Sequence, residues 1–208
     1  NPSDTQALVI ERGKPLGLIS LGLLGKHNLS NALAAIAVAR YVGVEWQAIA
    51  LALPDFVGAS RRFEVKGVQN GITFVDDYAH HPEEIKACLS SVRAMYPTQR
   101  MTVIFQPHLF TRTRDFAEGF SESLSLADEV VLLDIYPARE LPIPGVSSEM
   151  LMDGIKAAKK TLIQKNQVMD YLKESQPEVL VTMGAGDIDR LVPGIAAWMN
   201  STYNSSQS

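Results

Sequence analysis

The chain has 208 residues, of which 46% are hydrophobic and 20% are charged, and its formal net charge is -4 at pH 7. This length suits one large domain, or one domain and part of another, and the charge balance speaks against a general nucleic-acid-binding or membrane-binding surface. No apolar run approaches the ~20 residues of a membrane-spanning helix, and the single cysteine, Cys88, excludes an internal disulfide and fits a reducing cytoplasm.

The first 57 residues combine two short strands with two helices. Hydrophobic spacing and turn residues predict, in order, strands over 7–11 and 16–21, a helix that ends at Gly43, and a helix over 45–53. These elements are too few to bury their own apolar faces. We therefore expect residues 1–57 to be the end of a preceding domain.

Small residues near position 58 mark a domain boundary. Beyond it, the strands expected over 63–69 and 72–75 flank Asn70-Gly71, which is the strongest short signal for an antiparallel hairpin. A second domain over 58–200 should therefore begin with an antiparallel pair of strands.

The remainder of this second domain alternates strands with helices. We expect strands over 101–105, 129–133 and 179–183, and helices from Pro82 and over 115–126, 148–160, 168–174 and 188–199. Continuous apolar strands separated by helices predict a largely parallel sheet that is covered on both faces. The expected fold class is α/β: a Rossmann-like, mostly parallel sheet with an antiparallel N-terminal hairpin, preceded by a small α+β segment. The polar end, 201–208, should be a disordered tail.

The turn that follows residues 72–75 gathers several reactive side chains. Its sequence is Asp76-Asp77-Tyr78-Ala79-His80-His81, and the next residue, Pro82, suits the first turn of a helix. Open α/β sheets bind ligands beyond the carboxyl ends of their strands. Because solvated loops seldom gather two acids and two histidines around one aromatic, this pattern favours a functional site over an ordinary loop.

Two further turns should open on the same edge of the sheet. The turn after residues 101–105 carries His108, Arg112 and Arg114, and guanidinium groups suit carboxylates and phosphates. Each of these residues, taken alone, could equally be an ordinary loop residue or part of a salt bridge. The third turn, Gly184-Ala185-Gly186, could bring backbone N–H groups close to a ligand, although a tight turn is the commoner reason for such glycines.

Metal binding and covalent catalysis find less support. Adjacent histidines at a helix start point in different directions, and the chain has no helical His-x-x-x-His or Cys-based set. No Gly-x-Ser-x-Gly motif indicates a covalent nucleophile. No metal ligands are therefore predicted. The residues that a metal would otherwise use are Asp76, Asp77, His80, His81 and His108.

Several motifs occur in a fixed order along the chain. They are Gly25-Lys26-His27-Asn28-Leu29-Ser30-Asn31, Ser60-Arg61-Arg62-Phe63-Glu64, the turn Asp76 to Pro82, Gln106-Pro107-His108, Thr111-Arg112-Thr113-Arg114-Asp115, Pro142-Ile143-Pro144-Gly145 and Gly184-Ala185-Gly186-Asp187-Ile188. Together they resemble the Mur ligases of peptidoglycan synthesis over almost the whole chain. The resemblance implies that residues 1–57 end a central ATPase domain and that 58–200 form the C-terminal ligase domain. One departure is Leu109, where the family would lead us to expect a basic residue.

The resemblance implies a cytoplasmic, ATP-dependent ligase that joins L-alanine to UDP-N-acetylmuramate through an acyl phosphate. ATP and Mg²⁺ would be its cofactors, and the magnesium ligands would lie mainly in the central domain. The phosphate loop Gly-x-x-x-x-Gly-Lys-Thr does not occur in this sequence. The remaining domains of its own chain would be its partner, and this chain alone would be inactive. Two alternatives stay open: a sister ligase that adds murein tripeptide in recycling, and a non-enzymatic nucleotide-binding domain of the same fold.

The resemblance also implies roles for single residues. Those expected to serve ATP are His27 and Asn31 at the adenine, Arg62 at the phosphates or ribose, Asp77 at the ribose hydroxyls and Tyr78 beside the adenine. Those expected to serve the amino acid are Arg112, which would pair with the alanine carboxylate, and His80, His81 and His108, which would line the same pocket. One of these histidines would be a candidate for deprotonating the alanine ammonium group.

Overall fold

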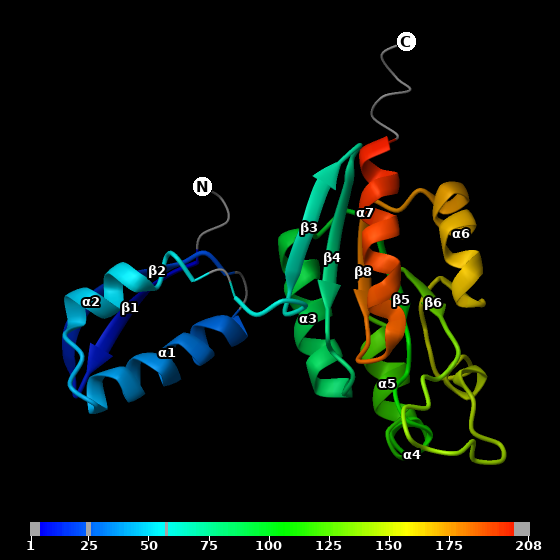
Figure 1. Cartoon of the computed structure of the whole chain (residues 1–208), viewed down its shortest axis with the longest axis horizontal. Coiled ribbons are helices and arrows are strands. Elements are labelled where there is room, and N and C mark those ends of the chain that lie inside the picture. The colour runs from blue at the N-terminus through cyan, green and yellow to red at the C-terminus, as the bar shows by residue number, and fades with distance from the viewer. Residues whose placement is uncertain (1–4, 24–25, 57, 202–208) are drawn as a thin grey trace, which may run out of the picture. The chain divides into compact units, whose positions relative to one another are not determined.

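The computed structural model describes residues 5–23, 26–56 and 58–201, without the side chains of residues 26 and 27. The chain forms two compact units, residues 1–60 and residues 61–208 (Figure 1). Their assignment to the central and C-terminal domains of a longer protein stays a prediction. Within the described residues, no helix is long and apolar enough to cross a membrane.

The first unit packs a two-stranded antiparallel sheet against two helices. Its elements are β1 (Thr5–Glu11), β2 (Lys14–Leu21), α1 (Lys26–Tyr41) and α2 (Trp46–Ala52). All four correspond to elements expected from the sequence, and Gly43 follows α1 with a φ of +87°, as is usual for a glycine that ends a helix. Its small core consists of Val9, Ile19, Leu21, Ala32, Ile36 and Ile49.

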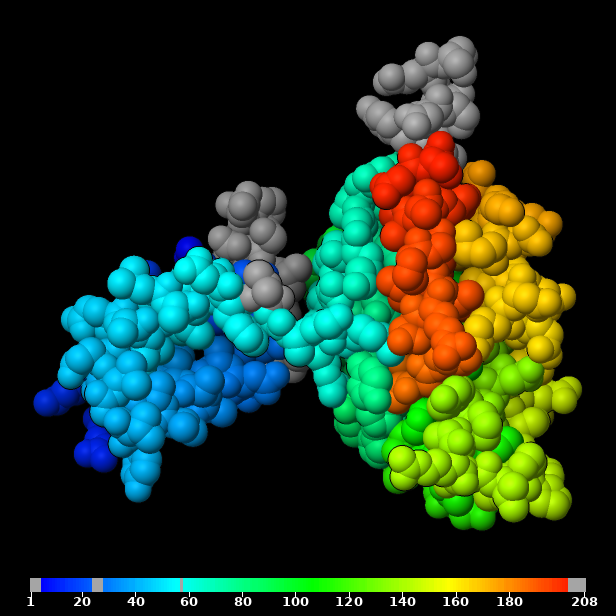
Figure 2. All heavy atoms as spheres, in the orientation of Figure 1, coloured from blue at the N-terminus to red at the C-terminus, as the bar shows by residue number. Residues whose placement is uncertain are grey.

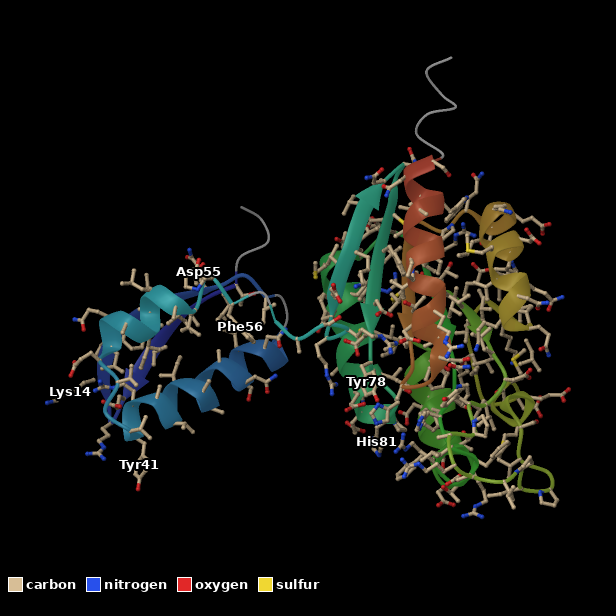
Figure 3. All side chains as sticks on the ribbon, in the orientation of Figure 1. Lys14, Tyr41, Asp55, Phe56, Tyr78 and His81 are labelled. Atoms are coloured by element: carbon tan, nitrogen blue, oxygen red, sulfur yellow. The ribbon has the colours of Figure 1, made fainter. Side chains whose placement is uncertain are left out.

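Large apolar side chains remain exposed in this unit. Leu18, Leu51 and Tyr41 expose 69%, 76% and 91% of their surface, and Tyr41 projects outward from the end of α1 (Figure 3). Apolar residues occur around most of the circumference of α1, a pattern typical of helices that are covered on more than one side. The unit therefore buries only part of its apolar surface, as its few elements led us to expect.

The second unit is built on a six-stranded sheet with the order β3-β4-β8-β5-β6-β7. The strands are β3 (Glu64–Gln69), β4 (Ile72–Asp77), β5 (Met101–Phe105), β6 (Glu129–Leu132), β7 (Lys159–Leu162) and β8 (Val179–Met183). β3 pairs antiparallel with β4 through the Asn70-Gly71 turn, and every other neighbouring pair is parallel. The predicted fold class is therefore confirmed.

Helices cover both faces of this sheet (Figure 1). On one face, apolar residues of β4, β5, β6 and β8 pack against α6 (Val168–Ser175) and α7 (Val192–Ser201). Figure 2 shows α7 at the surface beside β3. On the other face, α3 (Pro82–Met95) packs against α5 (Ala117–Leu124), and the rings of Phe105 and Phe120 lie 5.5 Å apart. The central strands are buried on both faces, which explains their continuous apolar sequences.

The prediction of a helix over 148–160 is wrong. This segment forms a short 3-10 helix, η1 (Ser148–Leu151), then a turn, and then β7, an edge strand that the sequence analysis missed. The Ser148 hydroxyl donates a hydrogen bond to the Leu133 carbonyl at 2.6 Å. Gly154 lies so close to Ser121 that a Cβ there would be 2.7 Å from the serine side chain. These long-range contacts hold the segment in a turn, and polar β7 lacks the apolar pattern that would reveal a strand.

Two other helices differ in detail from the expectation. The helix expected over 115–126 begins earlier and is divided at Phe116, whose φ and ψ of -117° and 22° interrupt it. The resulting pieces are α4 (Phe110–Asp115) and α5. The helix expected over 188–199 opens as the 3-10 helix η3 (Asp187–Leu191), and the short η2 (Lys165–Gln167) precedes α6. Of the expected tail, Ser201 ends α7 and residues 202–208 lie outside the described residues.

Candidate functional site

Three turns lie side by side at the carboxyl edge of the sheet, because β4, β8 and β5 are neighbours. Gln106, after β5, binds the turn after β8: its Oε1 accepts the N–H of Ile188 and its Nε2 donates to Asp187, both at 3.0 Å. A Cβ at Gly184 would lie 2.7 Å from the Gln106 carbonyl oxygen, and one at Gly186 would lie 2.6 Å from Oε1. The two glycines thus allow the turns to pack closely, which supports the tight-turn interpretation.

A buried ion pair ties the start of the second unit to this edge. The Nε of Arg61 lies 2.9 Å from Oδ2 of Asp76, whose side chain is fully buried. The other oxygen of Asp76 accepts a hydrogen bond from the Thr182 hydroxyl at 2.7 Å, and Arg61 also donates to the Gly184 carbonyl at 2.8 Å. Arg61 therefore connects β4 with the turn after β8. The sequence analysis missed this role, for which the only signal was the doubled arginine before the hairpin.

Asp77 organises the backbone around the first turn. Its side chain is buried, Oδ2 accepts the N–H of Phe63 at 2.7 Å, and Oδ1 accepts the N–H of Ala79 at 2.7 Å. These bonds join the entry to β3 with the exit from β4. The expected contact of Asp77 with a ribose stays a prediction.

Two guanidinium groups lie near one aromatic ring. Those of Arg61 and Arg62 are 5.3 Å and 5.5 Å from the centre of the Tyr78 ring, which lies at the end of β4 (Figure 3). Arg61 and Phe63, on either side of Arg62, have positive φ values of 58° and 50°. Such strained residues gather at binding sites, where the surrounding structure holds them. The Arg62 side chain is half exposed, so this group can meet a ligand that combines an anion with a planar ring.

The structure brings two of the three predicted histidines together. The ring centres of His80 and His108 are 6.2 Å apart, and the His108 ring stacks on Tyr136 at 5.7 Å. Nδ1 of His80 lies 2.9 Å from the Tyr78 carbonyl oxygen. A proton on Nδ1 donates to that oxygen and leaves Nε2 free to accept. His81, the N-cap of α3, instead places its ring 4.7 Å from that of Phe116.

Arg112 extends this pair into a row of three side chains. Its Nη1 lies 3.4 Å from Nδ1 of His108, which must be the acceptor because a guanidinium only donates. No carboxylate in the described part of the chain forms an ion pair with Arg112, whereas Arg114 pairs with Asp115 at 2.7 Å. Burial lowers the pKa of His108, and the charge of Arg112, with that of His80 when His80 is protonated, lowers it further. The row therefore offers a free cation beside a neutral imidazole.

The loop after β6 supports the start of α4. The Glu140 carboxylate accepts the N–H of Thr111 at 3.0 Å and its hydroxyl at 2.5 Å, and these bonds hold the pKa of Glu140 below its usual value. The N–H of Leu109 donates to the Tyr136 carbonyl at 2.9 Å, while Leu109 has a φ of +73°. Glu140 and Tyr136 thus fix the helix that carries Arg112. Sequence analysis had no means of finding them, because their partners lie about thirty residues away.

The remaining expectations concern the first unit and metal ions. Asn31 is exposed on α1, and the side chain of His27 lies outside what the structure describes. Their expected place beside an adenine stays a prediction. Among the described residues, no group of three or more His, Cys, Asp and Glu side chains is arranged to bind a metal ion.

Comparison with known proteins relates this site to one enzyme family. Residues 61–186 match the family model described as Mur ligase, glutamate ligase domain. The UDP-N-acetylmuramate–L-alanine ligase of Flavobacterium psychrophilum is 50% identical over 177 residues, which cover 85% of this chain and 40% of that protein. The corresponding ligase of Christiangramia forsetii is 51% identical over 170 residues, which cover 82% and 38%. The chain thus spans about 40% of the length of these relatives.

Two solved structures are similar to this chain in fold. A UDP-N-acetylmuramate-alanine ligase from Thermotoga maritima is 28% identical, with a TM-score of 0.75 over 99% of this chain and 44% of that chain. A murein peptide ligase from Psychrobacter arcticus is 23% identical, with a TM-score of 0.62 over 93% and 42%. At this lower identity the second likeness establishes the fold alone.

Proposed function

Because the chain belongs to the Mur ligase family, we propose that it is the C-terminal part of a cytoplasmic UDP-N-acetylmuramate–L-alanine ligase. In the whole ligase, ATP transfers its terminal phosphoryl group to the muramate carboxylate. The amino group of L-alanine then attacks the acyl phosphate, the C–N bond forms, and phosphate leaves. Protein groups contribute by holding the reactants and stabilising charge.

The observation that carries this proposal is the row formed by Arg112, His108 and His80. An amino acid has a carboxylate and an ammonium group on one carbon. The unpaired guanidinium of Arg112 suits the carboxylate through charge-assisted hydrogen bonds. A neutral imidazole nearby can accept a proton from the ammonium group, as the attack on an acyl phosphate requires. Both histidines are candidates for that step: His80 through Nε2, and His108 through Nδ1 once Arg112 turns to the carboxylate.

In this proposal the nucleotide binds beside Tyr78 and Arg62, away from the row formed by Arg112, His108 and His80. Tyr78 offers a ring surface for the adenine, and the half-exposed Arg62 offers a charge for phosphate. Asp77, His27 and Asn31 keep the roles that the family resemblance implies. Bound Mg²⁺ would neutralise phosphate charge. Its ligands are expected mainly in the central domain, as the family resemblance implies.

The two alternatives have weaker support. Relatives that are 42% to 51% identical are named as L-alanine ligases, whereas the murein peptide ligase is similar only in fold. A non-enzymatic nucleotide-binding domain would have no need of an unpaired arginine beside two histidines. These comparisons favour L-alanine as the acceptor.

Phosphate release tests the proposal. The full-length ligase is incubated with ATP, Mg²⁺ and UDP-N-acetylmuramate, and with L-alanine, murein tripeptide or neither. We expect release only with L-alanine, and none from the 208-residue chain alone. Tripeptide-dependent release would identify the sister ligase, and no acceptor-dependent release at all would contradict the ligase assignment.

A further inference from the structure

One carboxylate, that of Glu84 in the first turn of α3, lies between the two halves of the proposed site. Its Oε1 is 3.7 Å from Nη1 of Arg62, on the side assigned to the nucleotide. Its Oε2 accepts the backbone N–H of His80 at 3.0 Å and lies 3.4 Å from Nδ1 of the same residue, on the side assigned to the amino acid. The two oxygens therefore face different halves of the site.

Helix capping explains only part of this arrangement. Glu84 is the third residue after the N-cap, His81, and a glutamate or glutamine at that position commonly accepts backbone N–H groups at the helix start. Capping accounts for the bond to the His80 N–H. It does not require a charge, and it does not account for the side chains of His80 and Arg62 at the same carboxylate.

The surroundings keep Glu84 charged. Burial by itself would raise its pKa, but the backbone hydrogen bond from His80, the charge of His80 when it is protonated and the charge of Arg62 hold the pKa below the usual value for a glutamate. Glu83, the neighbour in the same helical turn, is exposed and forms no ion pair with any described residue. The two adjacent glutamates thus differ in their contacts and provide a natural comparison.

We propose that Glu84 is a positioning residue that couples the nucleotide half of the site to the amino-acid half. When Arg62 turns to a phosphate it leaves Glu84, and the carboxylate then acts on His80 alone. A stronger attraction of Glu84 for the Nδ1 proton, which it shares with the Tyr78 carbonyl, fixes the His80 ring with Nε2 available to the incoming amino acid. Nucleotide binding therefore strengthens amino-acid binding, and the coupling is reciprocal. This inference rests on the proposed function.

The test removes the charge of Glu84 and keeps its role as a helix cap. In the full-length ligase, E84Q retains an oxygen for the backbone N–H groups but removes the charge. We expect the KM for L-alanine to rise about threefold to fivefold, with an unchanged melting temperature. E83Q removes the same kind of charge one residue earlier. Its KM for L-alanine should stay within a factor of about 1.5 of the value for the unaltered ligase.

A double-mutant cycle isolates the coupling. At ATP concentrations well below saturation, where Arg62 still contacts Glu84, R62Q should lower the KM for L-alanine about twofold when Glu84 is present, and should leave it unchanged in the E84Q background. An equal effect of R62Q in both backgrounds, or an E84Q enzyme that behaves like E83Q, would overturn the proposal. The factor of two is in the range that a half-exposed pair can produce.

A second readout does not depend on catalysis. In the 208-residue chain, NMR signals of the His80 ring should shift on R62Q substitution and should not shift when E84Q is already present. If the unaltered ligase shows no alanine-dependent phosphate release, the proposed function is wrong. The His80 signals would still decide whether Glu84 links Arg62 to His80. Identical shifts in both backgrounds would refute the link.

Discussion

Arg61 and Asp76 form a buried ion pair in which Nε lies 2.9 Å from Oδ2, and the side chain of Asp76 has no exposed surface. A buried pair of this kind adds little net stability, because both charges lose their hydration. Removal of one partner is costly, since it leaves the other charge buried and uncompensated, at about 3–5 kcal/mol. Arg61 also donates to the Gly184 carbonyl, so its loss affects two turns of the site.

Substitution of Arg61 by leucine should therefore lower the free energy of unfolding of the second unit by about 3–5 kcal/mol. Urea unfolding followed by the fluorescence of Trp198, in a W46F background, measures this unit because Trp198 packs against its core. R114A is the matched control, since Arg114 and Asp115 are both half exposed and such a surface pair contributes little to stability. Equal losses in the two variants would contradict the structural role of Arg61.

The glycines of the third turn should not tolerate a side chain. G186A places a Cβ 2.6 Å from both Gln106 Oε1 and the Tyr136 side chain, so the turns must separate. We expect a loss of more than about 2 kcal/mol in the free energy of unfolding, with changed NMR signals of His108, which stacks on Tyr136. G194A, in α7, has no atom within 4 Å of the added Cβ and should be neutral or slightly stabilising. A stable G186A variant with unchanged His108 signals would refute the close packing.

The pKa of His108 should lie below the ordinary value near 6.5. R112Q should raise it only in part, because burial is the larger cause and the charge of Arg112 the smaller. Titration of the His108 ring by NMR measures both values, and R114Q should leave the midpoint unchanged. The folded chain binds this proton more weakly than the unfolded chain does. Its contribution to stability is therefore complete above pH 6.5 and is lost as the pH falls through the folded-state pKa.

A midpoint at or above 6.5 in the unaltered chain would contradict this account of the environment of His108. The same holds for a midpoint that R112Q does not move. The first result would show that burial does not favour the neutral imidazole, and the second that the charge of Arg112 does not act on His108.

The elements that sequence predicted well are those whose signals are local. Buried central strands such as β5 and β8 appear as continuous apolar runs, and Asn70-Gly71 identifies the hairpin without other information. β7 was missed because an exposed edge strand has no apolar face, and its pairing with β6 depends on residues thirty positions away. The helix expected over 148–160 failed for the same reason, since distant residues hold that segment in a turn.

The candidate site shows the same division. Motifs identified the turns and the side chains that project from them. The structure brings His80, His108 and Arg112 together, whereas the ring of His81 lies against Phe116. The supporting residues were not found, because Arg61 acts through Asp76 and Gly184, which only folding brings near. Glu84 could have been recognised as a helix cap from its spacing to His81. Its contact with Arg62 could not have been recognised from the sequence, because only folding brings the two residues together.

The central claim is that the unpaired guanidinium of Arg112 binds the carboxylate of the amino-acid acceptor. The most direct measurement is kcat/KM for L-alanine and for L-alaninamide, which lacks that carboxylate, in the full-length ligase and its R112A and R114A variants. We predict that R112A lowers kcat/KM for L-alanine by about a hundredfold, in keeping with the loss of about 3 kcal/mol for a charge-assisted bond, and changes the value for L-alaninamide less than threefold. R114A should leave both values nearly unchanged. An R112A enzyme with undiminished activity toward L-alanine, or with equal losses for both acceptors, would contradict the claim.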